Sequence, residues 1–182
     1  MDPLVLIASL SVGIAVIFII QSFKFKNSAR AEDKVMKGYF LLGLSGLMAK
    51  IAMADGQVSN DEASFANRIF GQMKLTDAER AMCIGNFVTA RREGLEARDH
   101  AKRFMAYANP LSCEFLYDLL WRIAGSDGRL DPAEDKLLAD IAHYLGLDGA
   151  AYERFKRGER PQYSKRDLRA AGVPESLVAL AN

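Results

Sequence analysis

Apolar residues recur along most of this chain at the three- and four-residue spacing of α-helices. From residue 32 onward the apolar stripes are interrupted by glycine, proline and short polar stretches, which mark where one helix ends and the next begins. The most apolar of these segments is 111–125, so we expect it at the centre of the fold. The pattern predicts an all-α protein with a bundle of about seven helices, over 32–54, 60–73, 76–92, 95–108, 111–125, 132–145 and 148–156.

Two of these helices carry specific packing expectations. Helix 32–54 is weakened by three glycines, Gly38, Gly43 and Gly46, and we expect them to let another helix approach closely. In helix 76–92 we expect the core-facing side to hold Met82, Ile84, Phe87 and Val88, and we expect Thr76 and Glu79 to form a capping box at its start.

A short phrase typical of a junction between two helices occurs twice, over 54–62 and over 126–134. In each copy a glycine, Gly56 or Gly128, supplies the left-handed conformation that ends a helix. The second copy lies 72 residues after the first, from 54 to 126, and apolar residues on both sides keep that offset. A repeat of this length predicts a duplicated multi-helix unit, and therefore a bundle with pseudo-twofold symmetry. The capping boxes expected in the two copies are Ser59 with Glu62 and Asp131 with Glu134.

Residues 3–23 carry no charge and are almost wholly apolar. At 1.5 Å per residue a helix of this length crosses the roughly 30 Å of a bilayer's hydrocarbon. We therefore expect a single transmembrane anchor over 1–23, followed by a basic juxtamembrane hinge over 24–31. A cleaved signal peptide is the alternative, but basic residues follow the apolar run and none precedes it. By the positive-inside rule the N-terminus then lies outside and the rest of the chain in the cytoplasm.

The composition changes again after residue 157. Residues 158–182 are expected to form a polar linker and a short helical tail, in which Ser164 and Asp167 cap one turn. The apolar residues of this tail are too many to be left in water, so we expect 164–181 to dock either on the domain or on a partner: Leu168, Val173, Leu177, Val178 and Leu180.

Charge and motif content exclude several function classes. The chain has 24 basic and 23 acidic residues, a net charge of +1 and no basic cluster, so nucleic acid is not an expected partner. Cys83 and Cys113 lack the spacing of a metal or redox site and are expected to be buried free thiols. No phosphate-binding loop or nucleophile elbow is present, and His100 and His143 stand on helix faces without a motif, the first expected to be solvated and the second partly buried. We predict no catalytic residue and no enzymatic activity.

The two Asp-Gly phrases, preceded by 50–54 and by 121–124, resemble those of the TerB-like domain. That domain is found in tellurite-resistance proteins and in the N-terminal half of membrane-anchored DjlA-type J-domain co-chaperones, and the resemblance covers 32–157. The anchor in front of the domain is similar to the DjlA arrangement. No His-Pro-Asp triplet occurs in the sequence, so we expect this chain to lack the J domain of those co-chaperones. Stimulation of an Hsp70-type chaperone is therefore not carried over.

The acidic residues of the two phrases are the candidate metal ligands. Each phrase is similar to the second half of an EF-hand loop, but its first half offers no carboxylate, so calcium binding of that type is not expected. The resemblance implies instead a divalent-cation site formed by Asp55, Glu62, Asp127 and Glu134. The alternative is that these side chains cap helices and pair with Lys50 and Arg122.

Together these observations favour a membrane-anchored cytoplasmic interaction module on a bacterial inner membrane. We expect protein partners, themselves membrane-associated, and a role as an adaptor in envelope or stress response or as an accessory subunit of a membrane complex. The alternative function is a divalent-metal-binding domain similar to those of tellurite resistance. No cofactor is expected apart from that possible cation.

Overall fold

The structure is a computed structural model that describes residues 35, 37–54, 60–73, 75–92, 95–125 and 128–181. The expected transmembrane anchor over 1–23 and the hinge over 24–31 lie outside these residues. None of the described helices is both long and apolar enough to cross a membrane.

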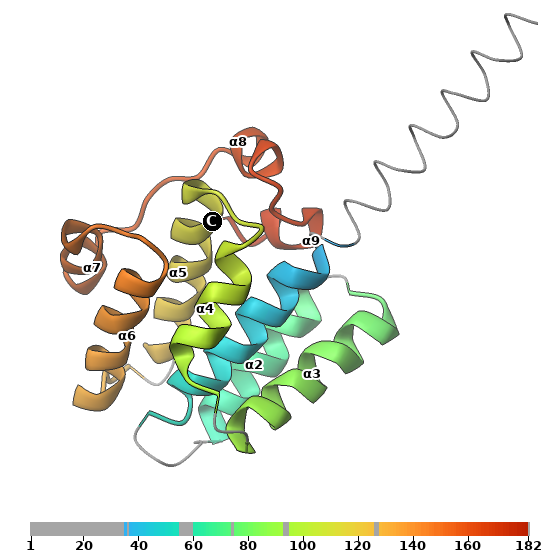
Figure 1. Ribbon diagram of the computed structural model, residues 1–182, viewed down its shortest axis with the longest axis horizontal. Helices are drawn as coiled ribbons and strands as arrows, with labels where there is room; N and C mark the ends of the chain where they lie inside the picture. Colours follow the sequence, from blue (N-terminus) through green and yellow to red (C-terminus); the bar gives the residue numbers. More distant parts are fainter. Residues whose placement is uncertain are drawn as a thin grey trace, which may run out of the picture. The chain divides into compact units, whose positions relative to one another are not determined.

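The described residues form helices joined by turns, and no strand occurs among them (Figure 1). The all-α expectation is confirmed for this part of the chain. Its first helix covers 37–51. The helices that follow are α2 (Asn60–Gln72), α3 (Asp77–Arg92), α4 (Ala97–Met105), α5 (Pro110–Ala124), α6 (Pro132–Tyr144), α7 (Gly149–Lys156), α8 (Lys165–Ala170) and α9 (Glu175–Val178).

The starts of several helices are fixed by the side chains expected to cap them. Before α3, the Thr76 amide donates to Glu79 Oε2 at 2.9 Å and the Glu79 amide donates to Thr76 Oγ1 at 3.3 Å. Before α8, the Asp167 amide donates to Ser164 Oγ at 3.4 Å. These bonds satisfy amides that have no partner within the first turn of a helix, so both predicted caps are confirmed.

Helix α5 lies at the centre of the core. Between Ser112 and Ala124 only Glu114 and Arg122 are not buried. Helices α2 and α6 both pack against α5, and α6 in turn contacts α4 and α7. A helix that is apolar around most of its circumference needs neighbours on all sides, which is why the most apolar segment of the sequence takes this position.

Two glycines of the 37–51 helix allow α4 to approach closely, as expected. A Cβ atom built on Gly43 would lie 2.8 Å from Cβ of Phe104, and one built on Gly46 would overlap the imidazole ring of His100. Gly38 has no such neighbour within 4 Å. The close approach buries His100, which is 3% exposed, so the expectation that this histidine is solvated was wrong.

His143, expected to be partly buried, is exposed on α6. The two cysteines are as expected: Cys83 and Cys113 are free, buried thiols. Burial raises the pKa of each to about 11, so both stay protonated near neutral pH.

The 72-residue offset of the sequence repeat also holds for the helix boundaries. Helix α2 runs from Asn60 to Gln72 and α6 runs from Pro132 to Tyr144, so both ends are displaced by 72 residues. The next helices begin with the same offset, α3 at Asp77 and α7 at Gly149, but α3 has 16 residues and α7 only 8. The two halves of the domain therefore share the positions at which these helices start, and they differ in the lengths of α3 and α7.

The C-terminal segment docks on the domain itself. Leu168, Leu177 and Val178 are buried within the same apolar cluster as α5. The side-chain Nδ2 of Asn109 donates to the Ala171 carbonyl at 3.0 Å. Of the two alternatives for the tail, a surface of this domain or one of a partner, the structure shows the first.

Candidate functional site

The second Asp-Gly turn has the geometry predicted for it. Gly128 has φ +80°, in the left-handed region that residues with a Cβ rarely adopt. Asp131 Oδ1 accepts from the Ala133 amide at 2.7 Å, and Glu134 Oε2 accepts from the Asp131 amide at 2.9 Å. Pro132 stands at the first helical position, where its missing N–H costs nothing. The capping box of the second phrase is confirmed.

The metal hypothesis concerns four carboxylates, of which the structure describes one. Asp55 and Asp127 lie outside the described residues, as does Gly56, and for Glu62 the backbone in α2 is described and the side chain is not. Glu134 is buried and its carboxylate serves as a cap. Among the residues that the structure describes, no three His, Cys, Asp or Glu side chains converge on one point. Convergence of the four residues stays a prediction.

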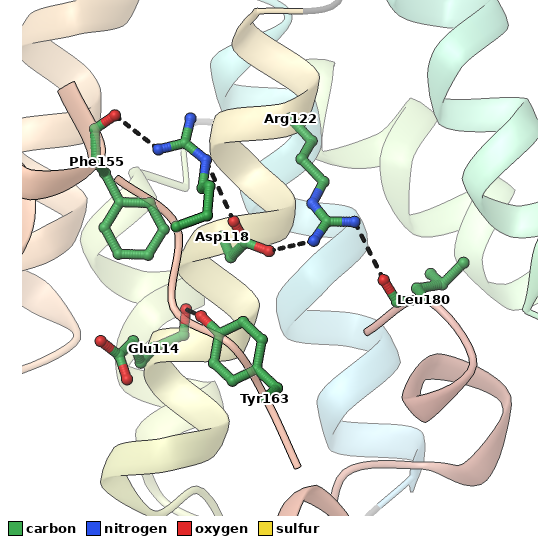
Figure 2. A network of polar contacts seen from close by, with 7 residues as sticks. Glu114, Asp118, Arg122, Phe155, Tyr163 and Leu180 are labelled. Atoms are coloured by element: carbon green, nitrogen blue, oxygen red, sulfur yellow. Dashed lines mark hydrogen bonds and ion pairs between the residues drawn. The ribbon is translucent and has the colours of Figure 1, made fainter. Parts of the chain in front are cut away.

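Arg122, expected as a partner of the turn carboxylates, contacts other groups. It donates to Asp118 Oδ2 at 2.6 Å and to the Leu180 carbonyl at 3.1 Å, as Figure 2 shows. Arg160 lies on the other side of the same carboxylate, with Nε 3.4 Å from Asp118 Oδ1, and donates to the Phe155 carbonyl at 2.6 Å. Two arginines, one on α5 and one on the C-terminal segment, thus share one acid.

Asp118 is the one fully buried carboxylate of this network, with 0% of its side chain exposed. Burial raises the pKa of Asp118, and the charges of Arg122 and Arg160 act in the opposite direction. The side chains of Arg122 and Arg160 are each 34% exposed. The aromatic rings of Trp121 and Phe155 lie under Arg160, at 5.4 Å and 5.0 Å from its guanidinium carbon. This arrangement fastens the C-terminal segment to α5.

A pocket of about 300 Å³ opens between the 37–51 helix, α3 and α4. The first helix contributes an aromatic ring, an aliphatic side chain and a glycine; α3 contributes an amide and α4 two basic groups. The lining residues are Tyr39, Leu42, Gly43, Asn86, His100 and Arg103. Asn86 of α3 follows Leu42 of the first helix by 44 residues of sequence, so no local sequence motif marks the pocket.

Helix α3 presents an apolar strip to solvent. Ile84 is 39% exposed and Val88 38% exposed, although both were expected to face the core. Ala81, one turn before Ile84, and Gly85 are exposed on the same side, and nothing lies within 4 Å of a Cβ built on Gly85. The four positions follow the i, i+3, i+4, i+7 spacing of a single helix face, which we call the α3 face. The core side of α3 is formed by Phe87, as expected, together with Cys83 and Ala90.

The sequence model of the family described as tellurite resistance protein TerB matches residues 41–157. The chain belongs to the TerB family. The resemblance carried by the two Asp-Gly phrases is thereby confirmed. The TerB match runs from within the 37–51 helix to just after α7, and therefore includes the α3 face, both repeats and every residue that lines the pocket except Tyr39.

Two relatives of the TerB chain are proteins named Co-chaperone protein DjlA. The one from Coxiella burnetii is 25% identical over 164 residues, which cover 87% of this chain and 60% of that protein. The one from Haemophilus ducreyi is 20% identical over 131 residues, which cover 71% and 46%. The chain thus spans about half the length of the co-chaperones it matches. No solved structure matches it.

The segment that follows the TerB match completes the core of the domain. Tyr163 is buried and donates from its hydroxyl to the Glu114 carbonyl at 3.3 Å, and its ring meets Phe115 edge-on at 5.2 Å between centroids. The sequence held one indication that this segment docks on α5, because Asp118 lies in a mostly apolar helix with Arg122 four residues later. An acid in that setting needs more than one partner, and Arg160 supplies the second.

Proposed function

We propose that this protein is a membrane-anchored TerB-family interaction module. In this proposal it is displayed in the cytoplasm from a bacterial inner membrane and acts as an adaptor in envelope or stress response, or as an accessory subunit of a membrane complex. Two features support the proposal: similarity to two proteins named as co-chaperones, and an apolar surface suited to a protein partner.

The observation that carries the proposal is the α3 face. A soluble helix normally turns its isoleucine and valine inward, and here Ile84 and Val88 lie outside while the core is filled by other residues. Ala81 and Gly85 have too little side chain to hold a partner away, so a helix of another protein can pack its ridge against α3. Covering one such aliphatic side chain contributes about 1 kcal/mol or more.

Capture from solubilised membranes with matched variants tests this surface. Ile84→Glu and Val88→Glu place a charge on the α3 face, and Ala150→Glu places the same charge on an exposed position of α7. We expect membrane proteins that co-purify with the unaltered chain and with Ala150→Glu to be lost from both α3 variants, at unchanged melting temperatures. The same proteins captured by all four chains would contradict the role of the α3 face.

Reporter fusions test the topology, which rests on the uncharged run over 3–23 and the basic residues after it. A C-terminal fusion to a reporter that is active only in the cytoplasm is expected to give a signal. Alkaline phosphatase activity from such a fusion, or a mature protein that begins near Glu32, would contradict the anchored cytoplasmic arrangement.

A further inference from the structure

The pocket between the 37–51 helix, α3 and α4 has walls that are held in place. The Asn86 side chain donates to the Leu42 carbonyl at 2.9 Å and to Ser45 Oγ at 2.8 Å, which ties α3 to the first helix. On the opposite side, α4 packs directly against Gly43 and Gly46. A site whose walls are fixed before a ligand arrives loses less conformational entropy on binding.

The only formal charge among the side chains that line the pocket belongs to Arg103, apart from any proton on the His100 imidazole. Arg103 makes no ion pair or side-chain hydrogen bond with a residue that the structure describes. Lys37, a basic residue of the first helix two positions before Tyr39, is already paired with Glu79 at 2.8 Å. The pocket therefore presents one guanidinium group whose charge is not balanced within the described domain, and a guanidinium fork matches a carboxylate best.

The remaining lining favours an apolar stem next to that carboxylate. Leu42, Gly43 and the ring of Tyr39 form an apolar wall, and Tyr39 is held by stacking on Tyr107 with 3.7 Å between ring centroids. Both amide hydrogens of Asn86 are used within the protein, which leaves its carbonyl oxygen as an acceptor. The volume of about 300 Å³ is at the lower end for ligand pockets, so it suits one side chain or a small acid rather than a nucleotide.

We propose that this pocket binds a carboxylate carried on a short apolar stem, with Arg103 as its charge partner. The carboxylate can come from a free aliphatic or aromatic acid or from the C-terminal residue of a peptide, because both present the same group. The inference is independent of the α3 face and of the membrane anchor.

Calorimetric titration of the solubilised full chain tests the proposal. The probes are 3-phenylpropionate, its uncharged analogue 3-phenylpropanamide, and the tripeptide Gly-Gly-Phe with a free carboxylate. We expect saturable binding of at least one carboxylate, and at least tenfold weaker binding of the amide. The tighter of the two carboxylates identifies the source, a free acid or a chain end.

Variants on α4 test whether the carboxylate binds in this pocket. Arg103→Gln is expected to weaken carboxylate binding at least tenfold, and Arg103→Lys to weaken it less, because lysine keeps the charge and loses the fork. Arg98→Gln removes an exposed arginine of the same helix that does not line the pocket, and is expected to leave binding unchanged. The proposal is overturned if both carboxylates bind more weakly than about 10 mM, if the amide binds equally well, or if Arg98→Gln and Arg103→Gln have the same effect.

Discussion

Gly46 lies directly against the imidazole ring of His100, so closely that even a methyl group in its place would overlap the ring. The contact joins the 37–51 helix to α4 and explains how a histidine flanked by Arg98 and Asp99 is buried. His100 shares one side of α4 with Ala97, Ala101 and Phe104, which are all buried. The missing side chain of Gly46 on the first helix thus leaves the space that the His100 ring of α4 fills.

Gly46→Ala is expected to lower the free energy of unfolding by about 1–3 kcal/mol, because an added methyl group in a packed interface forces side chains or backbone to shift. The matched control is Gly38→Ala in the same helix, where nothing lies within 4 Å of the new Cβ. That variant is expected to be neutral or up to about 1 kcal/mol more stable, owing to the helix propensity of alanine. Urea denaturation of both variants measures the difference, and equal effects would contradict the close contact.

Gly128→Val is expected to destabilise the protein by more than about 1 kcal/mol, since a β-branched residue is strained at φ +80°. No atom lies within 4 Å of a Cβ built there, so the cost comes from the backbone alone. Gly149→Ala serves as control, because Gly149 opens α7 with open space around it and no positive φ. An unfolding midpoint for Gly128→Val equal to that of the unaltered protein would show that the turn has another conformation.

Leu177→Ala is expected to lower the free energy of unfolding by about 2–5 kcal/mol, the usual range when a fully buried leucine is replaced by alanine. Leu177 belongs to α9 and is 0% exposed, whereas Leu180 in the same segment is only partly buried. Leu180→Ala is therefore expected to lower the free energy of unfolding by clearly less than Leu177→Ala does. Thermal unfolding of the two variants separates a docked tail from a loose one, and negligible costs in both would contradict docking.

The Glu79 carboxylate makes part of the stability depend on pH. Burial alone would raise the pKa of Glu79, but hydrogen bonds from Lys37 and Thr76 outweigh it and hold the pKa below its ordinary value of 4.5. A carboxylate with a lowered folded-state pKa contributes stability that is present above the unfolded-state pKa and is lost as the pH falls through the folded-state value. Glu79→Gln is expected to lower stability by about 0.5–1 kcal/mol at pH 7 and to converge with the unaltered protein near pH 3.

Asp77→Asn is the control for this titration, because Asp77 stands in the same first turn of α3 but forms no ion pair with a described residue. Asp77→Asn is expected to lower the stability at pH 7 by less than Glu79→Gln does. A stability difference between Glu79→Gln and the unaltered protein that stays constant from pH 7 to pH 3 would contradict the role of the charge.

The double variant Asp55→Asn, Asp127→Asn separates the two hypotheses for the turns. Because Glu134 is engaged as a cap, we expect no heat when magnesium, calcium, manganese or zinc is added to the unaltered protein, and only a small loss of stability in the double variant. A saturable heat that the double variant abolishes, with its metal-free fold intact, would establish chelation instead.

The features that the sequence predicted well are local ones. Gly128, Asp131 and Glu134 act within one turn, so their residue types and spacing suffice to define the conformation. The same holds for Thr76 with Glu79, where a cap and its partner are three residues apart.

The features that the sequence did not predict depend on how helices are rotated against one another. Periodicity in α3 allowed Ile84 and Val88 to face inward, but the core side is taken by Cys83 and Phe87. Helical spacing fixes which residues share a face and leaves open which face is covered. The pocket is harder to predict, because Arg103 lines it only once the 37–51 helix has packed against α4.

The contact between Asp118 and Arg160 also sets an order of events during synthesis. When α5 leaves the ribosome, its buried acid and the ring of Phe115 have no covering partner, because Arg160 and Tyr163 are translated later. Residues 160–181 must therefore emerge before the core can close, so the domain finishes folding only after its last helices are made. Until then α5 is an exposed apolar segment, and a chain that ends near the end of the TerB match is expected to aggregate more readily than the complete domain.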